Sequence, residues 1–129
     1  MKQVKIIIER SKDFYTAYAE NVKGISGGGE TVLEAKESVL ACIEILKELD
    51  NIPKILQGEY ELIYKFDTQS LLNYYKGIFT NSALGRITGI NQKLIQHYAS
   101  GLKRPRPTQA YKIQKALHDL GHELISVEL

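Results

Sequence analysis

Tryptophan is absent from this chain, cysteine and methionine each occur once, and proline occurs three times. The single cysteine, Cys42, excludes an internal disulfide, so we expect a cytoplasmic protein in which this thiol is buried as a small apolar side chain. No apolar run approaches the roughly 18 residues that cross a bilayer. The start of the chain, MKQVKIIIER, leads into a predicted strand, and we expect no signal peptide.

Sequence patterns for catalysis and cofactor binding are also missing. The glycines at 27–29 do not form the GxxxxGK[ST] or GxGxxG arrangements that cradle phosphate, so we predict a turn or mobile loop there. The three histidines, His97, His118 and His122, lie in or beside predicted C-terminal helices, and we identify no nucleophile and base pair around them. We therefore predict no enzyme, no cofactor and no metal site.

The two halves of the chain differ in charge. Residues 1–66 carry nine Lys and Arg against eleven Asp and Glu, whereas residues 67–129 carry eight against four. The overall net charge of +2 therefore conceals a basic C-terminal half. Such an excess is typical of a nucleic-acid surface, although a solvated charged face gives the same count. We expect two small domains, residues 1–66 and 67–129, in a chain of this length.

Residues 81–106 have the pattern of two short helices around a tight turn, followed by a basic loop. Apolar residues recur at helical spacing in both helices: Ala83, Leu84 and Ile87, then Leu94, Ile95 and Tyr98. Gly89 interrupts the pattern, Ile90 supplies an apolar plug, and Asn91 can cap the second helix. Gly101 ends this helix as a left-handed cap should.

Two sets of side chains in this segment are suited to DNA. The first set faces outward from the second helix and is predicted to read bases: Gln92, Lys93, Gln96 and His97. Glutamine can pair with adenine N6 and N7, and lysine can reach guanine O6 or N7. The second set is predicted to bind phosphates: Asn81, Ser82, Lys103, Arg104 and Arg106. The alternative is a pair of core helices whose outer face meets only water.

The remainder of the C-terminal half is predicted to close a small helical core. Thr108 can cap a helix over residues 109–120, in which one face is apolar. That face consists of Ala110, Ile113, Ala116, Leu117 and Leu120. Residues 122–128, HELISVE, follow Gly121 and are predicted to form a terminal strand that pairs with another strand or subunit.

The segment ALGRITGINQKLIQHYASGLKRP resembles the XRE class of helix-turn-helix domains, which is also called Cro and lambda-repressor-like. The order of parts matches over residues 81–121. It includes a small residue at the tight packing position (Ala83), the turn glycine (Gly89), an aromatic (Tyr98), and Gly101 before the basic residues. The resemblance implies binding to operator DNA. We expect a homodimer whose half-sites are spaced by about one helical turn, roughly 34 to 36 Å, or a multiple of it.

The N-terminal half reads as a hairpin, a third strand, a long helix and a last strand. The hairpin covers residues 4–9 and 14–20, the third strand lies within 24–29, and the last strand covers 60–66. Thr31 and Glu34 form a capping box at the start of a helix over residues 32–49. The predicted buried stripe of this helix is Leu33, Val39, Leu40, Ile43, Leu46 and Leu49.

This β-β-β-α-β order, with the segment YTAYAENVKGISGGGETVLEAKESVLACIEIL, resembles the N-terminal domain of HicB-type antitoxins. The fold class is then α+β, with a partial ribonuclease-H-like domain followed by an all-α helix-turn-helix domain and a short C-terminal strand. The resemblance implies that the first domain binds and neutralises a HicA-like, RNA-cleaving toxin, and that the second represses the shared operon. Four acids are candidate toxin contacts, with solvated strand ends as the alternative: Glu9, Asp13, Glu20 and Glu30.

Two other functions compete with the antitoxin. The first is a stand-alone repressor whose N-terminal domain serves dimerisation or ligand sensing. The second is a metal-dependent nuclease, because ribonuclease-H-like sheets can carry converging carboxylates. The first predicted strand, VKIII, has no central carboxylate, and the acids of the long helix are spread over several turns, so the pattern disfavours this chemistry.

Overall fold

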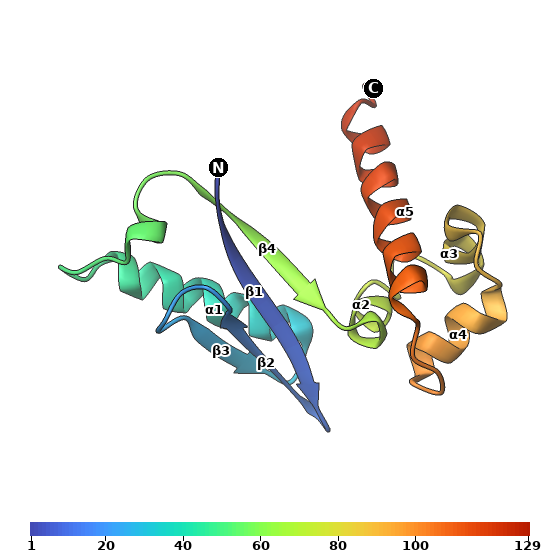
Figure 1. Ribbon diagram of the computed structural model, residues 1–129, viewed down its shortest axis with the longest axis horizontal. Coiled ribbons are helices and arrows are strands. Elements are labelled where there is room, and N and C mark those ends of the chain that lie inside the picture. Colours follow the sequence, from blue (N-terminus) through green and yellow to red (C-terminus); the bar gives the residue numbers. More distant parts are fainter. The chain divides into compact units, whose positions relative to one another are not determined.

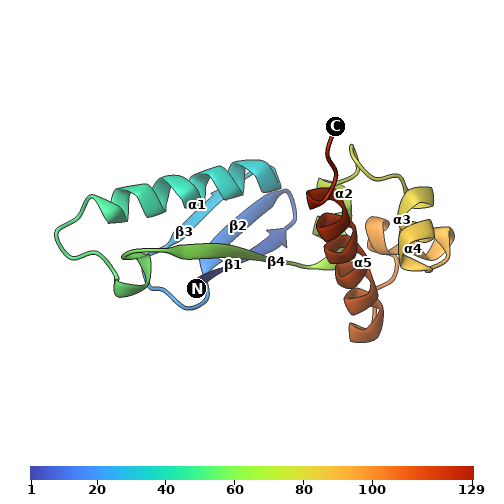
Figure 2. The same ribbon diagram turned by 90° about the horizontal axis from the view of Figure 1, so that it is seen from above.

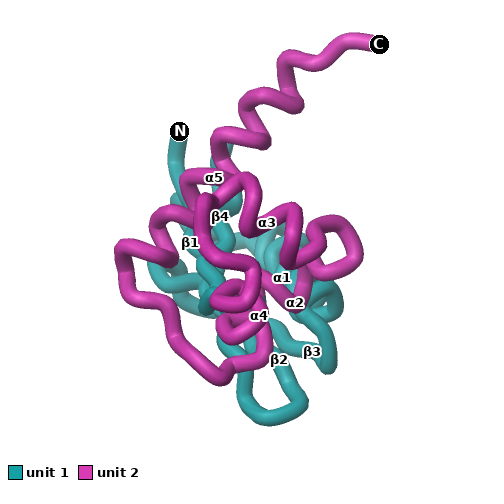
Figure 3. The backbone as a smooth tube through the Cα atoms, turned by 90° about the vertical axis from the view of Figure 1, so that its right-hand side faces the viewer, with its two compact units in different colours: residues 1–70 teal, residues 71–129 magenta.

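The computed structural model describes residues 1–129 and has an α+β architecture. The chain divides into two compact units, Met1–Ser70 and Leu71–Leu129 (Figure 3). The predicted domain boundary lies a few residues earlier, between residues 66 and 67. None of the helices combines the length and apolar character that a membrane span requires.

A four-stranded sheet and one long helix make up most of the first unit (Figure 1). Its elements are β1 (Lys2–Ser11), β2 (Phe14–Ala19), β3 (Ser26–Gly29), α1 (Val32–Lys47), the 3-10 turn η1 (Lys54–Leu56) and β4 (Tyr60–Phe66). The strand order in the sheet is β3-β2-β1-β4. The β1–β2 and β2–β3 pairs are antiparallel, whereas β4 runs parallel to β1.

Helix α1 covers one face of this sheet, and no helix of the unit covers the other (Figure 2). Burial therefore alternates along β1. Val4, Ile6 and Ile8 point into the helix-covered face and are fully buried. From α1 the buried partners are Val32, Ala35, Val39 and Ile43. The predicted stripe was therefore wrong at three positions, which are exposed: Leu33, Leu40 and Leu49. The buried stripe instead includes Val32 and Ala35, which are not in the predicted set.

The glycine run forms strand β3, which confirms a third strand within residues 24–29, whereas the turn or mobile loop predicted at residues 27–29 was wrong. A Cβ on Gly27 would lie 2.5 Å from Ser38 Oγ, and a Cβ on Gly29 would lie 2.4 Å from Glu34 Cβ. The Gly28 N–H also donates to Ser38 Oγ at 3.1 Å. The absence of side chains thus allows the backbone of β3 to pack directly against α1.

Local side-chain bonds fix both the start of α1 and its contact with the β2–β3 connection. Thr31 Oγ1 accepts the Glu34 N–H at 3.1 Å, which confirms the predicted cap. The Glu34 carboxylate accepts the Glu30 N–H at 2.8 Å, one residue before the expected donor. Cys42 is half-buried rather than fully buried, and its Sγ donates to the Gly24 carbonyl at 3.2 Å.

Four helices belong wholly or largely to the second unit. They are α2 (Thr68–Tyr74), α3 (Asn81–Thr88), α4 (Gln92–Ser100) and α5 (Pro107–Ile125), and the unit boundary falls within α2. Their shared core consists of Leu72, Leu84, Ile90, Ile95, Tyr98 and Ile113. Helix α2 was not predicted, although its Leu72 belongs to this core.

Two predictions at the ends of α5 were wrong. The helix begins at Pro107 after Arg106, rather than after a Thr108 cap, because proline is favoured at the first helical position. It then continues through Gly121 to Ile125, so the predicted terminal strand at residues 122–128 does not exist. Leu124 extends the apolar spacing of Leu117 and Leu120, and this helical period continues through the glycine.

Candidate nucleic-acid interface

A three-residue turn joins α3 to α4. Gly89 has a φ of 75°, in the left-handed region, and its N–H donates to the Gly85 carbonyl at 2.9 Å. Thr88 Oγ1 donates to the Leu84 carbonyl at 2.6 Å and accepts the Ile90 N–H at 3.1 Å. The Ile90 side chain is buried, as expected for the plug. The direction of the turn is thus determined by the left-handed backbone at Gly89, three hydrogen bonds and one core contact.

Helix α3 approaches the turn and the start of α4 closely at Gly85. A Cβ at this position would lie 3.1 Å from the Ile90 carbonyl oxygen and 3.5 Å from Gln92 Cα. The sequence predicts the tight packing position at Ala83, which is half-buried. A glycine two residues later is what lets the start of α4 close on α3.

Both ends of α4 are held by hydrogen bonds. Asn91 Oδ1 accepts the Lys93 N–H at 2.8 Å, which confirms the predicted cap. At the other end Gly101 has a φ of 83°, and the Lys103 N–H donates to the His97 carbonyl at 3.2 Å. Asn73 Nδ2, from α2, donates to the Ala99 carbonyl at 2.8 Å. Helix α4 therefore presents its outer face from a fixed position within the unit.

The outer face of α4 carries the four side chains that we predicted to read bases. Ile95 and Tyr98 are buried on the opposite side of the helix, as their spacing predicts. Gln92, Lys93 and Gln96 are exposed, and His97 is half-buried. Two amides and one ammonium thus project from a single helical surface. These groups can donate and accept hydrogen bonds at base edges in a major groove.

The loop between α4 and α5 supplies fixed positive charge beside that face. Lys103, Arg104 and Arg106 are exposed. The two ion pairs of the chain, Glu44–Lys47 and Lys115–Asp119, involve none of these three side chains. Their charges are therefore available to an anionic ligand such as a phosphate backbone.

The start of α3 brings together the remaining two predicted phosphate contacts. Ser82 is exposed and Asn81 is half-buried, both in the first turn of the helix. Thr80 Oγ1 accepts the Ala83 N–H at 3.0 Å and caps this turn. Thr80 was not recognised from the sequence, although a threonine before a helical run is a usual cap.

Two further cations of the second unit were missed from the sequence. Arg86 projects from α3, Lys76 lies in the α2–α3 connection, and both are exposed. Residues 71–129 carry eight Lys and Arg against three Asp and Glu, so this unit has a net charge of plus five. The period of α3 places Arg86 opposite the buried Leu84, and this was the signal that could have found it.

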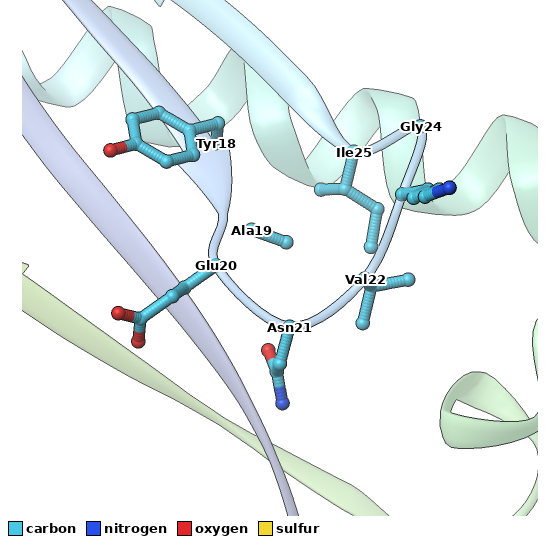
Figure 4. A pocket seen from close by; sticks show the side chains of 8 residues that line it. Tyr18, Ala19, Glu20, Asn21, Val22, Gly24 and Ile25 are labelled. Carbon is cyan, nitrogen blue, oxygen red and sulfur yellow. The ribbon is translucent and has the colours of Figure 1, made fainter.

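An open pocket of the first unit is lined by the end of β2 and the β2–β3 connection (Figure 4). Asn21 secures this connection, because its Oδ1 accepts the Lys5 N–H at 3.1 Å and its Nδ2 donates to the Gln3 carbonyl at 2.8 Å. Tyr18, on the pocket wall, donates its hydroxyl to Glu9 at 3.0 Å, and this bond raises the pKa of Tyr18.

The acids proposed as partner contacts are dispersed over the first unit. All four are exposed, and they occupy β1, the β1–β2 turn, the β2–β3 connection and the residue before the α1 cap: Glu9, Asp13, Glu20 and Glu30. No three His, Cys, Asp or Glu side chains of the chain form a group that could hold a metal ion. Comparison with models of known protein families, with curated proteins and with solved structures finds no match for this chain.

Proposed function

We propose that the second unit is a helix-turn-helix domain of the XRE type, in which α4 enters the major groove of operator DNA. The observation that carries this proposal is the surface of α4. The helix is capped at both ends and exposes Gln92, Lys93 and Gln96, while the adjoining loop has three unpaired cations. Polar side chains that read base edges and cations that bind phosphates are the two components that a DNA reader needs.

The two groups of side chains have different roles in this proposal. Gln92, Lys93, Gln96 and His97 contact base edges and select the sequence. The phosphate contacts are Asn81, Ser82, Lys103, Arg104 and Arg106, which fix the register of the protein on the duplex. Arg86 joins the second group, because it is an exposed cation on the helix that precedes α4.

The first unit, in this proposal, is a partial ribonuclease-H-like domain of a HicB-type antitoxin. It binds a HicA-like toxin and blocks RNA cleavage, while the complete protein represses the shared operon. One charge difference supports this division of roles. Residues 1–70 carry nine Lys and Arg against twelve Asp and Glu, a net charge of minus three, which complements a basic RNA-binding partner.

Co-purification tests both parts of the proposal at once. The tagged protein is expressed together with the untagged product of the neighbouring gene, and the purified material is tested for a mobility shift on their shared promoter. A stable complex that shifts the promoter is the expected result. Promoter binding without a co-purified partner would remove the antitoxin role and leave the DNA-binding role intact.

A stand-alone repressor is the second candidate, in which the first unit serves dimerisation. The unpaired edge of strand β4 favours this candidate, because an exposed strand edge is a template for pairing with another chain. The presence or absence of a short basic reading frame beside the gene distinguishes the two candidates. Its absence would favour the repressor.

A further inference from the structure

Strand β4 lies at the edge of the sheet and lacks three features that often protect such an edge: a bulge, a proline and a very short length. It pairs with β1 on one side only (Figure 1). Its register with β1 is continuous from Lys2 opposite Tyr60 to Ile8 opposite Phe66, so it contains no bulge. It also contains no proline, and its seven residues exceed the four of β3, the strand at the opposite edge.

The sequence of β4, YELIYKF, is complementary to itself when reversed about Ile63. In an antiparallel pair of two such strands, Ile63 lies opposite its own copy. Glu61 then lies opposite Lys65 of the second copy, and Lys65 lies opposite Glu61. If one strand slips by one residue relative to the other, in either direction, both Glu–Lys pairs are lost.

We propose that two copies of this chain associate through antiparallel pairing of their β4 strands about a two-fold axis at Ile63. The result is one continuous sheet across both copies. Because a two-fold axis between antiparallel strands is perpendicular to the sheet, both α1 helices cover the same face. The paired residues keep their present faces, since opposite residues in an antiparallel pair share a face.

The uncovered face contributes charge complementarity to this interface. Glu61 and Lys65 are exposed there, and Ile63 is 38% exposed between them. Glu61 accepts a hydrogen bond from Gln3 Nε2 at 2.9 Å through one carboxylate oxygen, which leaves the second oxygen for the lysine of the other copy. The pairing therefore brings together one apolar contact and two ion pairs.

The helix-covered face contributes aromatic contacts. The same register places Tyr60 opposite Phe66 and Leu62 opposite Tyr64, all of which are half-buried in the single chain. Cross-strand pairs of aromatic and apolar side chains are among the more stabilising pairs in sheets. On this face the Lys36 ammonium lies over the Tyr64 ring, 4.4 Å from its centroid.

Helix α1 leaves room for a second strand beside β4. It packs mainly on β2 and β3, at the other side of the sheet (Figure 2). Near β4 its contributions are the long side chains of Lys36 and Lys47, the second of which lies 4.8 Å from the Tyr60 ring centroid. A second copy is the occupant that fits, since it supplies both the missing strand and the matching charges.

Charge reversal at Glu61 or Lys65 tests the proposal with the full-length chain. Glu61→Lys and Lys65→Glu each place like charges opposite one another at two sites, so each should weaken association roughly tenfold to a hundredfold. The double variant E61K/K65E restores both pairs. Lys23→Glu, in the exposed β2–β3 connection, is the control for a change of charge away from β4.

Light scattering coupled to size exclusion measures the mass of each variant near the dissociation constant of the wild type. At this concentration the wild type should have a mass between those of the monomer and the dimer. We expect each single variant to have a mass close to that of the monomer, and the double variant and the Lys23→Glu control to keep the wild-type mass. An equimolar mixture of Glu61→Lys and Lys65→Glu should also recover the wild-type mass, because every opposing pair is then Lys with Glu. A misfolded variant could not produce this recovery.

Three results would overturn the proposal. They are a wild-type chain that remains monomeric, single variants that keep the wild-type mass, and a mixture that does not recover it. The inference does not depend on DNA binding, so a mobility shift by the same variants reports separately on the second unit. Association through β4 with no shift would leave this interface standing and remove the proposed function.

Discussion

Replacing Gly89 with alanine should destabilise the second unit by about 1 to 2 kcal/mol, because an L-residue pays this cost in the left-handed region. Gly89 has a φ of 75°, and a Cβ there would meet no atom within 4 Å. The cost is therefore confined to the backbone conformation, with no contribution from a clash. For a unit of about 60 residues, this loss corresponds to a fall in Tm of roughly 4 to 16 °C.

The same substitution at Gly121 should have the opposite effect. Gly121 lies within α5, and a Cβ there also meets no atom within 4 Å. Alanine is favoured over glycine in a helix interior by about 1 kcal/mol. Gly121→Ala should therefore stabilise the unit. Each of the two variants adds one methyl group to the wild type, so they are matched in chemistry.

Urea unfolding followed by circular dichroism measures both variants against the wild type. We expect the midpoint of the helical transition to fall for Gly89→Ala and to rise for Gly121→Ala. Equal effects of the same sign would refute the assignment of Gly89 as a left-handed cap and of Gly121 as a helical residue. A mobility shift of the folded Gly89→Ala variant, measured without urea, would then show whether the turn also affects DNA binding.

Three further predictions concern the interface, the sheet and helix α5. Gln96→Ala should cost about 1 to 3 kcal/mol on the operator and relax base preference. Arg104→Ala should weaken all duplexes alike and reduce the salt slope, and identical profiles for the two variants in a binding titration would contradict these roles. Gly27→Ala should destabilise the first unit by about 1 to 3 kcal/mol, because its Cβ would lie 2.8 Å from the Val39 amide nitrogen, and calorimetry that shows an unchanged transition would refute this packing. The hydrogen bond from Lys115 lowers the pKa of Asp119 in the folded protein. The contribution of this pair to folding stability should therefore be complete above the ordinary aspartate pKa of about 3.9, and it should be lost as the pH falls through the lower folded-state pKa. An NMR titration of the Asp119 carboxyl that gives an ordinary or raised pKa would contradict this pair.

Local signals in the sequence predicted a substantial part of the fold. Strand β4 has its predicted bounds, because its alternating residues cover the helix-facing side of the sheet. The caps at Thr31, Asn91 and Gly101 were also predicted and confirmed, since each depends on a side chain or backbone preference within three residues. Such features require no knowledge of distant contacts.

Features that depend on distant contacts were not predictable in this way. Gly27 has the local preferences of a turn, and its place in a strand involves pairing with Ala17 of β2 and close packing against Ser38 of α1. Gly121 resembles a helix end, yet α5 continues through it to Ile125, where the exposed Leu124 and Ile125 give no packing reason that the sequence could have shown. Leu72 is in the core of the second unit, although the short helix that carries it has no strong pattern of its own.

The candidate interface was predictable at its outer face and less so at its supports. Burial of Ile95 and Tyr98 on one side of α4 determines which side chains face outward, and the helical period gave this directly. The support from Asn73 comes from a helix 26 positions away along the chain. The close approach at Gly85 likewise depends on the position of α4, which the sequence period does not specify.

Sequence discrimination by the wild-type chain is the measurement that tests the central claim most directly. A fluorescence titration at fixed salt compares a duplex containing the promoter of its own gene with a scrambled duplex of the same length and composition. If α4 reads base edges, the promoter should bind at least about a thousandfold more tightly, as specific complexes usually do. Equal affinity for the two duplexes would contradict the assignment of α4 as a recognition helix.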